Sequence, residues 1–309
     1  MSENQHSVLV SILLPTYNGA NYIKEFLESI KRQDYRPIEL IISDDNSTDN
    51  TLSIIKHWIH KNGVDIHTRL IVGKKNLGLS GNFSRMRHHI SGNYIFIADQ
   101  DDIWEANKIT EQVNYLNKNT DCIMCICDRS IIDSKGKTLC RSEASFYNRK
   151  KKKMKFNQII CEPSIYAANC MALRNKYLDN IFSVPEKIVE HDTYMTIIAS
   201  YYGDIGFLQK PLIRYRIHNN NLSGSFVIET NKNIIRCFIA RLKVNNKINR
   251  TKLNDGIIIA DILQKKYNID IYKTNNKLIN YKVENVYLTS FLDIIKAITD
   301  KKLNYFYKN

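Results

Sequence analysis

The sequence has 309 residues, 43% hydrophobic and 25% charged, a balance that excludes a disordered chain and is typical of a soluble globular protein. Lys and Arg number 45 against 31 Asp and Glu, and the formal net charge of +14 favours phosphate-rich partners such as nucleotides, nucleic acid or an anionic membrane surface. No apolar run approaches the ~18 residues that a membrane-spanning helix needs, and no basic segment precedes the first apolar run, so we expect a cytoplasmic protein without a secretory signal.

The N-terminal third of the chain alternates between apolar runs and segments with helical periodicity. The apolar runs predict strands at Val8–Leu14, Ile38–Ser43, His67–Val72 and Tyr94–Ala98. The segments between them predict helices at Tyr22–Gln33, Thr51–Lys61 and Asn82–Ile90. This alternation predicts an α/β fold with a mainly parallel sheet and helices on its faces.

Polar residues gather directly after three of these strands. Pro15–Asn18 ends the first strand, Asp44–Asp49 follows the second, and Asp99–Asp102 follows the fourth. Ligands of such sheets bind beyond the carboxyl ends of the strands, so we expect these three clusters to form one site. Neither GxGxxG nor GxxxxGK[ST] follows a strand, which argues against an ordinary dinucleotide site or a P-loop.

The cluster after the fourth strand, in the sequence IFIADQDDIW (95–104), is the most informative stretch. Asp99, Asp101 and Asp102 place three carboxylates within four residues, where they repel one another. A hard divalent cation such as Mg²⁺ or Mn²⁺ gives a fold a reason to collect them, because these ions bridge carboxylates to phosphates. The alternative is an acidic turn with solvated charges.

The second half of the chain continues with more strands and helices. Apolar patterns predict a helix at Lys108–Leu116, a strand at Cys122–Asp128, a helix at Ile188–Ala199 and extended segments at Ile205–Leu208 and Pro211–His218. The basic run 149–155 (RKKKKMK) is either a solvated surface loop or a mobile loop near phosphates or anionic lipid.

Cysteines are seven in number, and three of them lie in the apolar run CIMCIC. Cys122 and Cys125 have a zinc-like spacing, but no second pair of ligands follows at a suitable interval. We therefore expect buried thiols in a reducing compartment.

The last segment, residues 226–309, differs in character from the rest. It is rich in Asn and Lys, has helical apolar stripes, and carries 16 Lys and Arg against 7 Asp and Glu. Such a composition fits a helical region that docks on the inner face of the plasma membrane, or one that packs on the rest of the protein.

Taken together, five motifs resemble those of the family-2 glycosyltransferases, which have a GT-A fold. They are VSILLPTYNG (10–19), ELIISDDNSTDNT (39–51), the NLG and GN of 76–82, GNYIFIADQDDIW (92–104) and EHDTYMTIIASYYGDIGFLQKPLIRYRIHNNNLSG (190–224). The resemblance covers residues 8–225, so we expect a GT-A catalytic domain at 1–225 and a basic helical region at 226–309. The last motif is most similar to bacterial enzymes of surface polysaccharide synthesis, including rhamnosyltransferases.

The resemblance implies roles for individual residues. Those implied to bind the nucleotide, with Asp44 hydrogen-bonded to the base edge, are Pro15, Thr16, Tyr17, Asn18, Asp44, Asp45, Asn76 and Gly78. Those implied to bind a divalent metal, Mn²⁺ or Mg²⁺, are Asp99, Asp101, Asp102 and His218. Asp192 matches the catalytic base, and His191 stands where the family commonly has Glu. Asn169 stands where relatives often have Gly.

The function that these residues imply is an inverting, metal-dependent glycosyltransferase. It would move a sugar from a UDP- or dTDP-sugar to a glycan acceptor, lipid-linked, in surface or capsular polysaccharide synthesis. Inversion follows because base and leaving group lie on opposite faces of the sugar. Two alternatives are a sugar-nucleotide nucleotidyltransferase, for which PTYNGANY lacks an Arg-bearing phosphate loop, and a non-enzymatic basic module on membrane or nucleic acid. No aromatic-plus-basic stripe points to nucleic acid as a partner.

Overall fold

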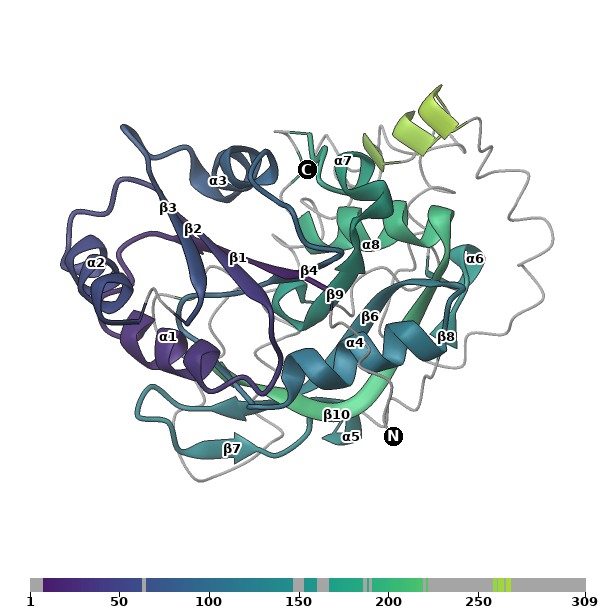
Figure 1. Cartoon of the computed structure of the whole chain (residues 1–309). Coiled ribbons are helices and arrows are strands. Elements are labelled where there is room, and N and C mark those ends of the chain that lie inside the picture. The colour runs from purple at the N-terminus through teal and green to yellow at the C-terminus, as the bar shows by residue number, and fades with distance from the viewer. Residues whose placement is uncertain are drawn as a thin grey trace, which may run out of the picture.

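A mixed sheet with helices on both faces forms the centre of the protein (Figure 1). The structure is a computed structural model that describes residues 8–62, 65–146, 153–159, 167–185, 188, 191–218, 221, 258–259, 261–263 and 265–267. In Figure 1 the helices α3, α7 and α8 lie above the sheet, and α1 and α4 lie below it. This arrangement confirms the expected α/β fold.

The sheet has ten strands, and its main path runs β3-β2-β1-β4-β9-β6-β10-β5. The strands are β1 (Val10–Thr16), β2 (Ile38–Asp44), β3 (His67–Val72), β4 (Tyr94–Ile97), β5 (Ile103–Trp104), β6 (Cys122–Ile132), β7 (Thr138–Cys140), β8 (Lys153–Met154), β9 (Met171–Arg174) and β10 (Asp204–Arg216). Neighbours from β3 to β4 are parallel, β9 is antiparallel to both β4 and β6, and β10 runs parallel to β6. The sheet is therefore mixed but mainly parallel in its N-terminal half.

The connecting segments are mostly helical. They are α1 (Ile23–Lys31), α2 (Thr51–Asn62), α3 (Gly78–Arg87), α4 (Lys108–Lys118), α5 (Glu143–Phe146), α6 (Phe156–Ile159), α7 (Leu178–Ile181) and α8 (His191–Tyr202), with short 3-10 turns at Ala168–Cys170 and Asn175–Tyr177. All seven residues of β1 and all seven of β2 are buried, because helices cover both faces of these central strands. This two-sided burial explains why their sequences are continuous apolar runs rather than alternating ones.

Three expected boundaries differ from the structure. Pro15 lies inside β1 instead of ending it. Because β4 pairs with β1 only as far as Leu13, Pro15 has a single strand neighbour, and its missing N–H is tolerated there. The helix expected from Asn82 begins at Gly78. The two extended segments near residue 210 form one strand, β10, with register shifts on either side of Pro211.

Four of the cysteines, Cys122, Cys125, Cys127 and Cys170, are buried free thiols, as expected, and Cys140 is a half-buried one. Cys161 and Cys237 lie outside the described residues. Of the basic run 149–155, only the last three residues are described; Lys153 and Met154 form β8, which pairs with β10, so this end of the run is not a loop.

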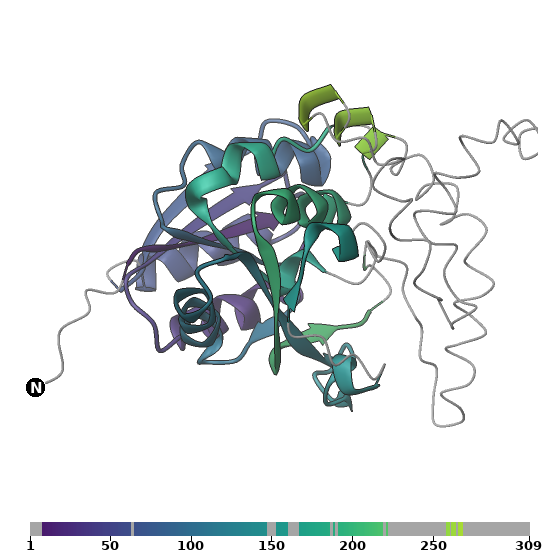
Figure 2. The same cartoon turned by 90° about the vertical axis from the view of Figure 1, so that its right-hand side faces the viewer.

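Part of the C-terminal region packs on the same side of the protein as α8 (Figures 1 and 2). The described helical residues between 258 and 267 bury Ile259 and Leu263, and the ring of Tyr267 lies 4.7 Å from that of Tyr201. The rest of 226–309 lies outside the described residues. Within the part of the chain that the structure describes, no helix combines the length and the apolar character required to cross a membrane.

Candidate active site

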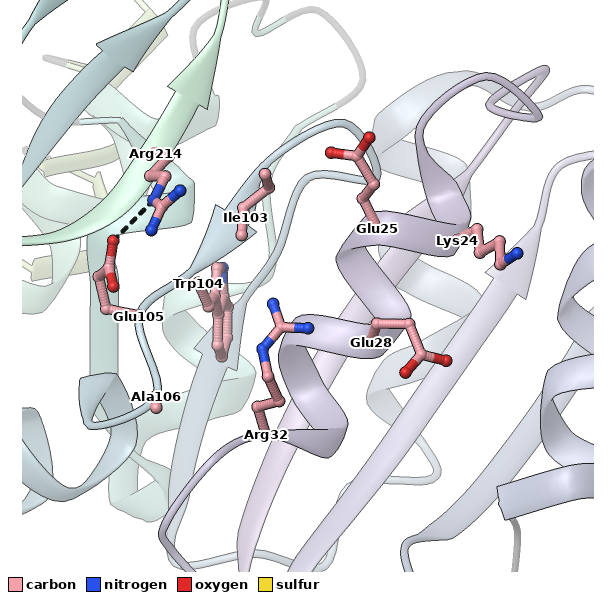
Figure 3. Close-up of a pocket in the computed structure, with 9 residues that line it drawn as sticks. All are labelled: Lys24, Glu25, Glu28, Arg32, Ile103, Trp104, Glu105, Ala106 and Arg214. Carbon is pink, nitrogen blue, oxygen red and sulfur yellow. Dashed lines mark hydrogen bonds and ion pairs between the residues drawn. The ribbon is translucent and has the colours of Figure 1, made fainter. Parts of the chain in front are cut away.

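A pocket of about 530 Å³ lies between α1 and β5 (Figure 3). Its lining includes Trp104, Arg32 and the ion pair of Arg214 with Glu105, but none of the predicted site residues. Because the polar clusters of the sequence meet elsewhere, we place the site at the carboxyl ends of β1, β2 and β4.

The sheet register brings the first two polar clusters together. Thr16 is paired with Asp44 in the β1–β2 ladder, and its hydroxyl donates to the Asp44 carboxylate at 3.0 Å. Ser47 adds two donors to the same carboxylate, its backbone N–H at 2.9 Å and its hydroxyl at 2.6 Å. Asn18 joins the two loops, because its side-chain oxygen accepts from the N–H of Thr48 at 2.8 Å. Asp44 is buried, and its bonds hold together the loops to which the resemblance assigns binding of the nucleotide base.

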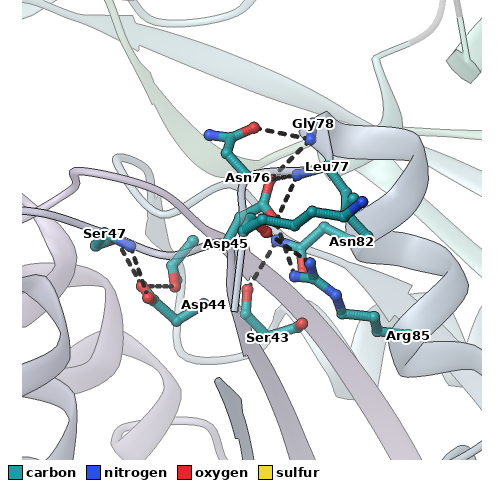
Figure 4. Close-up of polar contacts among 11 residues, drawn as sticks. Ser43, Asp44, Asp45, Ser47, Asn76, Leu77, Gly78, Asn82 and Arg85 are labelled. Carbon is teal, nitrogen blue, oxygen red and sulfur yellow. Dashed lines mark hydrogen bonds and ion pairs between the residues drawn. The ribbon is translucent and has the colours of Figure 1, made fainter. Parts of the chain in front are cut away.

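Asp45 lies at the start of α3, in the cluster shown in Figure 4. Its carboxylate accepts from the backbone N–H groups of Leu77 and Gly78 and pairs with Arg85 at 2.7 Å. Asn76 accepts a further bond from the N–H of Gly78 at 2.9 Å. A carboxylate at a helix N-terminus satisfies donors that have no partner within the helix. The contact with Asp45, the residue that follows β2, explains why α3 begins four residues earlier than its apolar periodicity indicates.

Gln100, which sequence reasoning did not single out, ties the acidic cluster to the first loop. Its side-chain amide accepts from the N–H of Tyr17 at 3.1 Å and donates to the Tyr17 carbonyl at 2.9 Å. The Tyr17 side chain is 45% exposed beside this contact. The Gln between two Asp residues was the available signal, because an amide can donate and accept at once.

The three carboxylates of the acidic cluster have different surroundings. Asp101 faces His218, with its Oδ2 2.7 Å from the Nε2 of the imidazole, although 117 residues separate the two in the sequence. Asp102 is fully buried, and its oxygens accept from the side-chain amide of Asn169 at 2.6 Å and the backbone N–H of Arg216 at 3.2 Å. The structure therefore brings Asp101 and His218 together and turns Asp102 inward.

Electrostatics connect Asp192 to this cluster. Burial raises the pKa of Asp99 to about 7, with further upward contributions from Asp101 and Asp192, while Arg129 and Asn169 act in the opposite direction. Burial also raises the pKa of Asp102 well above its ordinary value, helped by its two neighbouring carboxylates. Asp192 and Asp99 thus lie close enough to repel one another, although they come from α8 and the end of β4.

Asp192 lies in the first turn of α8, as predicted, and accepts from the N–H of Thr193 at 2.8 Å. A helix N-terminus favours the ionised form of a carboxylate. The preceding residue, His191, begins the helix and is also half-buried. The geometry therefore keeps both residues as candidates for a proton acceptor.

The cluster fits a divalent cation that phosphates help to hold. Within the described residues, no group of three His, Cys, Asp or Glu side chains is arranged so that it could hold a metal ion. Asp101 and His218 nevertheless offer one oxygen and one nitrogen at the same point, and Asp99 repels Asp101 nearby. Mg²⁺ sites of this kind use one or two carboxylates and leave the remaining positions to water and substrate phosphate.

Arg129, which has no local sequence signal, supplies positive charge beside the acidic cluster. Its guanidinium pairs with Glu143, at 3.1 Å from Nε, and lies 4.2 Å above the ring of Tyr215. This cation lowers the pKa of Asp99 against the effect of burial. It thereby balances part of the negative charge that the cluster collects.

Replacing Asn169 by aspartate is expected to lower the free energy of unfolding by about 2–4 kcal/mol. The change removes the N–H donor to the buried Asp102 and adds a carboxylate among three others. Urea titration followed by circular dichroism measures the difference. Asn114→Asp, the same chemical change at an exposed position inside α4, serves as control and should stay within about 0.5 kcal/mol of the native protein. Equal stability of the two variants would contradict a stabilising Asn169–Asp102 contact.

Comparisons with known proteins show which sequences this chain resembles. The sequence model described as "Glycosyl transferase family 2" matches residues 11–182. An Escherichia coli protein named UDP-Glc:alpha-D-GlcNAc-diphosphoundecaprenol beta-1,3-glucosyltransferase WfgD is 33% identical over 38% of this chain and 44% of its own length. The chain spans less than half the length of the curated relatives it matches first, 46% and 42%.

Solved structures with the same fold include TarS and a mannosyltransferase. Residues 1–349 of Staphylococcus aureus TarS, in complex with UDP-GlcNAc, give a TM-score of 0.56 at 19% identity, covering 89% of this chain and 76% of that one. The mannosyltransferase PcManGT from Pyrobaculum calidifontis, in complex with GDP-Man and Mn²⁺, gives 0.53 at 21% identity, covering 67% and 56%.

Proposed function

Because the chain belongs to glycosyl transferase family 2, we propose that this GT-A enzyme moves a sugar from a UDP- or dTDP-sugar to an acceptor hydroxyl, with inversion at the anomeric carbon. The observation that carries the proposal is the contact of Asp101 with His218, next to the pair of Asp99 and Asp192. Family membership argues against the two alternatives, a sugar-nucleotide nucleotidyltransferase and a non-enzymatic binding module.

The donor base would lie against the loops after β1 and β2. Asp44 has one unused acceptor direction beside its bonds to Thr16 and Ser47, and the imide N–H of uracil or thymine could donate to it. Tyr17 is exposed on the same edge and offers its ring to the base. TarS binds UDP-GlcNAc and PcManGT binds GDP-Man, so proteins of this fold differ in the nucleotide base that they accept.

A divalent cation, Mn²⁺ or Mg²⁺, would be held by Asp101 and His218, with Asp99 beside them. When bound, it would neutralise the charge that develops on the nucleotide diphosphate as the leaving group departs. Asp102 is buried and bonded to Asn169 and Arg216, so we assign it to shaping the loop rather than to ligation.

Asp192 would take the proton from the acceptor hydroxyl as that oxygen attacks the anomeric carbon. It must be ionised to do so, and the N-terminus of α8 favours that form. Asp99 and Asp192 repel one another when both are ionised, and the positive charge of Arg129 favours the ionised form of Asp99. A bound cation would reduce this repulsion.

For the acceptor we propose a glycan linked to a lipid diphosphate, in surface or capsular polysaccharide synthesis. WfgD, by its name, transfers glucose to such a lipid-linked sugar. The basic composition of the chain also fits an acceptor that carries an anionic diphosphate.

Nucleotide release from a panel of donors tests the proposal. The full chain is incubated with UDP-, dTDP-, GDP- and ADP-sugars, with Mn²⁺ or with excess EDTA, and the released nucleotide is measured. We expect release from UDP- or dTDP-sugars only, and only with the cation. Preference for GDP- or ADP-sugars would overturn the assignment of the base, and full activity in EDTA would overturn that of the metal.

Residues 226–309 could also bind an anionic membrane surface, placing the enzyme peripherally on the inner face of the plasma membrane. The excess of Lys and Arg supports this, whereas Ile259 and Leu263 use their apolar side chains to pack on the catalytic domain. We expect co-sedimentation with anionic liposomes at low salt that is lost at high salt, because screening removes the attraction. Absence of salt-sensitive binding would leave packing as the role of this region.

A further inference from the structure

Arg216, at the end of β10, is a buried cation that takes no part in the proposed transfer reaction. The residue is 1% exposed and lies two positions before His218. Its Nε donates to the backbone carbonyl of Asp101 at 2.9 Å, and its own backbone N–H donates to the carboxylate of Asp102 at 3.2 Å. One residue therefore contacts both of the last two aspartates of the acidic cluster.

The rest of the guanidinium is also engaged. Nη2 pairs with the carboxylate of Glu25 at 2.5 Å, and Nη1 lies 3.3 Å from the carbonyl of Ser134. Burying a guanidinium is costly unless its donors are satisfied, and Glu25, whose side chain is 56% exposed, is the only carboxylate paired with it among the described residues. A planar cation that is bonded through each of its three nitrogens has little freedom to move, so the loop that it holds is fixed as well.

Tyr22 connects this cation to His218. Its ring lies 4.7 Å from the guanidinium carbon of Arg216 and 4.8 Å from the centre of the His218 imidazole. The tyrosine thus has the cation and the imidazole as neighbours, and the imidazole in turn faces Asp101 at 2.7 Å. Arg216 reaches the Asp101–His218 pair from two directions, through the Asp101 backbone and through the Tyr22 ring.

We propose that Arg216 is the positioning residue of the cation and diphosphate site, and that Tyr22 transmits its effect to His218. The inference rests on the proposed function. Arg216 bonds to the backbone carbonyl of Asp101 and not to its carboxylate, so the guanidinium fixes the position of the residue without neutralising the carboxylate that faces His218. Without the guanidinium, Asp101 and His218 would still be present but would no longer be held at one point.

Calorimetric titration of UDP into the full chain, with and without Mn²⁺, tests this inference. The quantity compared is the dissociation constant of UDP without Mn²⁺ divided by that with Mn²⁺. This ratio measures how far the cation assists nucleotide binding. Arg216→Met should reduce this ratio by roughly tenfold or more, because ligands that are no longer held in place lose the binding free energy of a charge-assisted contact. UDP binding without the cation should change little, because the variant leaves the bonds of Asp44 with Thr16 and Ser47 in place.

Matched variants separate positioning from general destabilisation. Arg214→Met removes an exposed arginine on the same strand and should keep the native ratio. Tyr22→Phe keeps the ring and should keep the ratio, whereas Tyr22→Ala should lower it. If Arg216→Met does not fold, Glu25→Gln is the second variant. It weakens the ion pair that holds the guanidinium of Arg216 and should lower the ratio partially.

The outcomes are distinct from those of the proposed function. A native enzyme whose UDP binding is indifferent to Mn²⁺ would overturn the metal assignment and this inference together. A native enzyme that depends on Mn²⁺, with Arg216→Met or Glu25→Gln retaining the full ratio, would overturn this inference alone.

Discussion

Asp192→Asn is expected to lower kcat by about 10²–10⁴-fold, with donor binding nearly unchanged, because general-base contributions fall in that range. An asparagine at this position keeps the size of the side chain and can still accept from the N–H of Thr193, but it cannot take a proton from the acceptor. The change also removes one of the charges that raise the pKa of Asp99. Steady-state kinetics at saturating donor, with the KM for donor measured in parallel, give the comparison.

His191→Ala is the control for this prediction, since an unperturbed imidazole, with a pKa near ~6.5, is the rival base. If Asp192 is the base, His191→Ala loses much less activity than Asp192→Asn. Both variants must melt near the native temperature for the comparison to hold. The reverse ranking would move the base to His191 and break the residue-by-residue match to the family.

Asp101→Asn is expected to abolish transfer while leaving the fold intact. A neutral amide is a poor ligand for a hard cation, so the Asp101–His218 pair would no longer hold one. The backbone carbonyl of Asp101 still accepts from Arg216 in this variant, which is why the loop should stay in place. Transfer activity and the Mn²⁺ dependence of UDP binding are measured together, and both should be lost.

A second readout of Asp101→Asn concerns Asp99. Asp101 is one of the charges that raise the pKa of Asp99 to about 7, so its removal should move that pKa back towards the ordinary value. Carboxylate titration followed by NMR in the absence of metal measures this shift. Native-like activity of Asp101→Asn, with an unchanged melting temperature, would show that the pair does not carry the cation.

Local pattern accounts for most of the sheet in the N-terminal half. The apolar runs that became β1, β2, β3 and β4 predicted these strands to within two residues at each end. Burial on both faces makes β1, β2 and β4 mostly apolar, whereas the edge strand β3 is only partly buried. The same patterns placed Asp192 in the first turn of α8 and put three polar clusters on one edge of the sheet. These features depend on neighbours within a few residues, and such neighbours are visible in a sequence.

Tertiary structure decided which polar side chains meet. His218 contacts Asp101 only because β10 returns beside β5 and continues past the acidic cluster, and Asn169 reaches Asp102 because β9 lies between β4 and β6. The start of α3 was likewise set by Asp45, in the loop that follows β2. The sequence by itself determined the fold class, the strands and the family motifs, since burial periodicity is local. The bonding of Arg216 and Asn169, and the inward turn of Asp102, depended on strand order, because a buried polar group must find partners that distant segments supply.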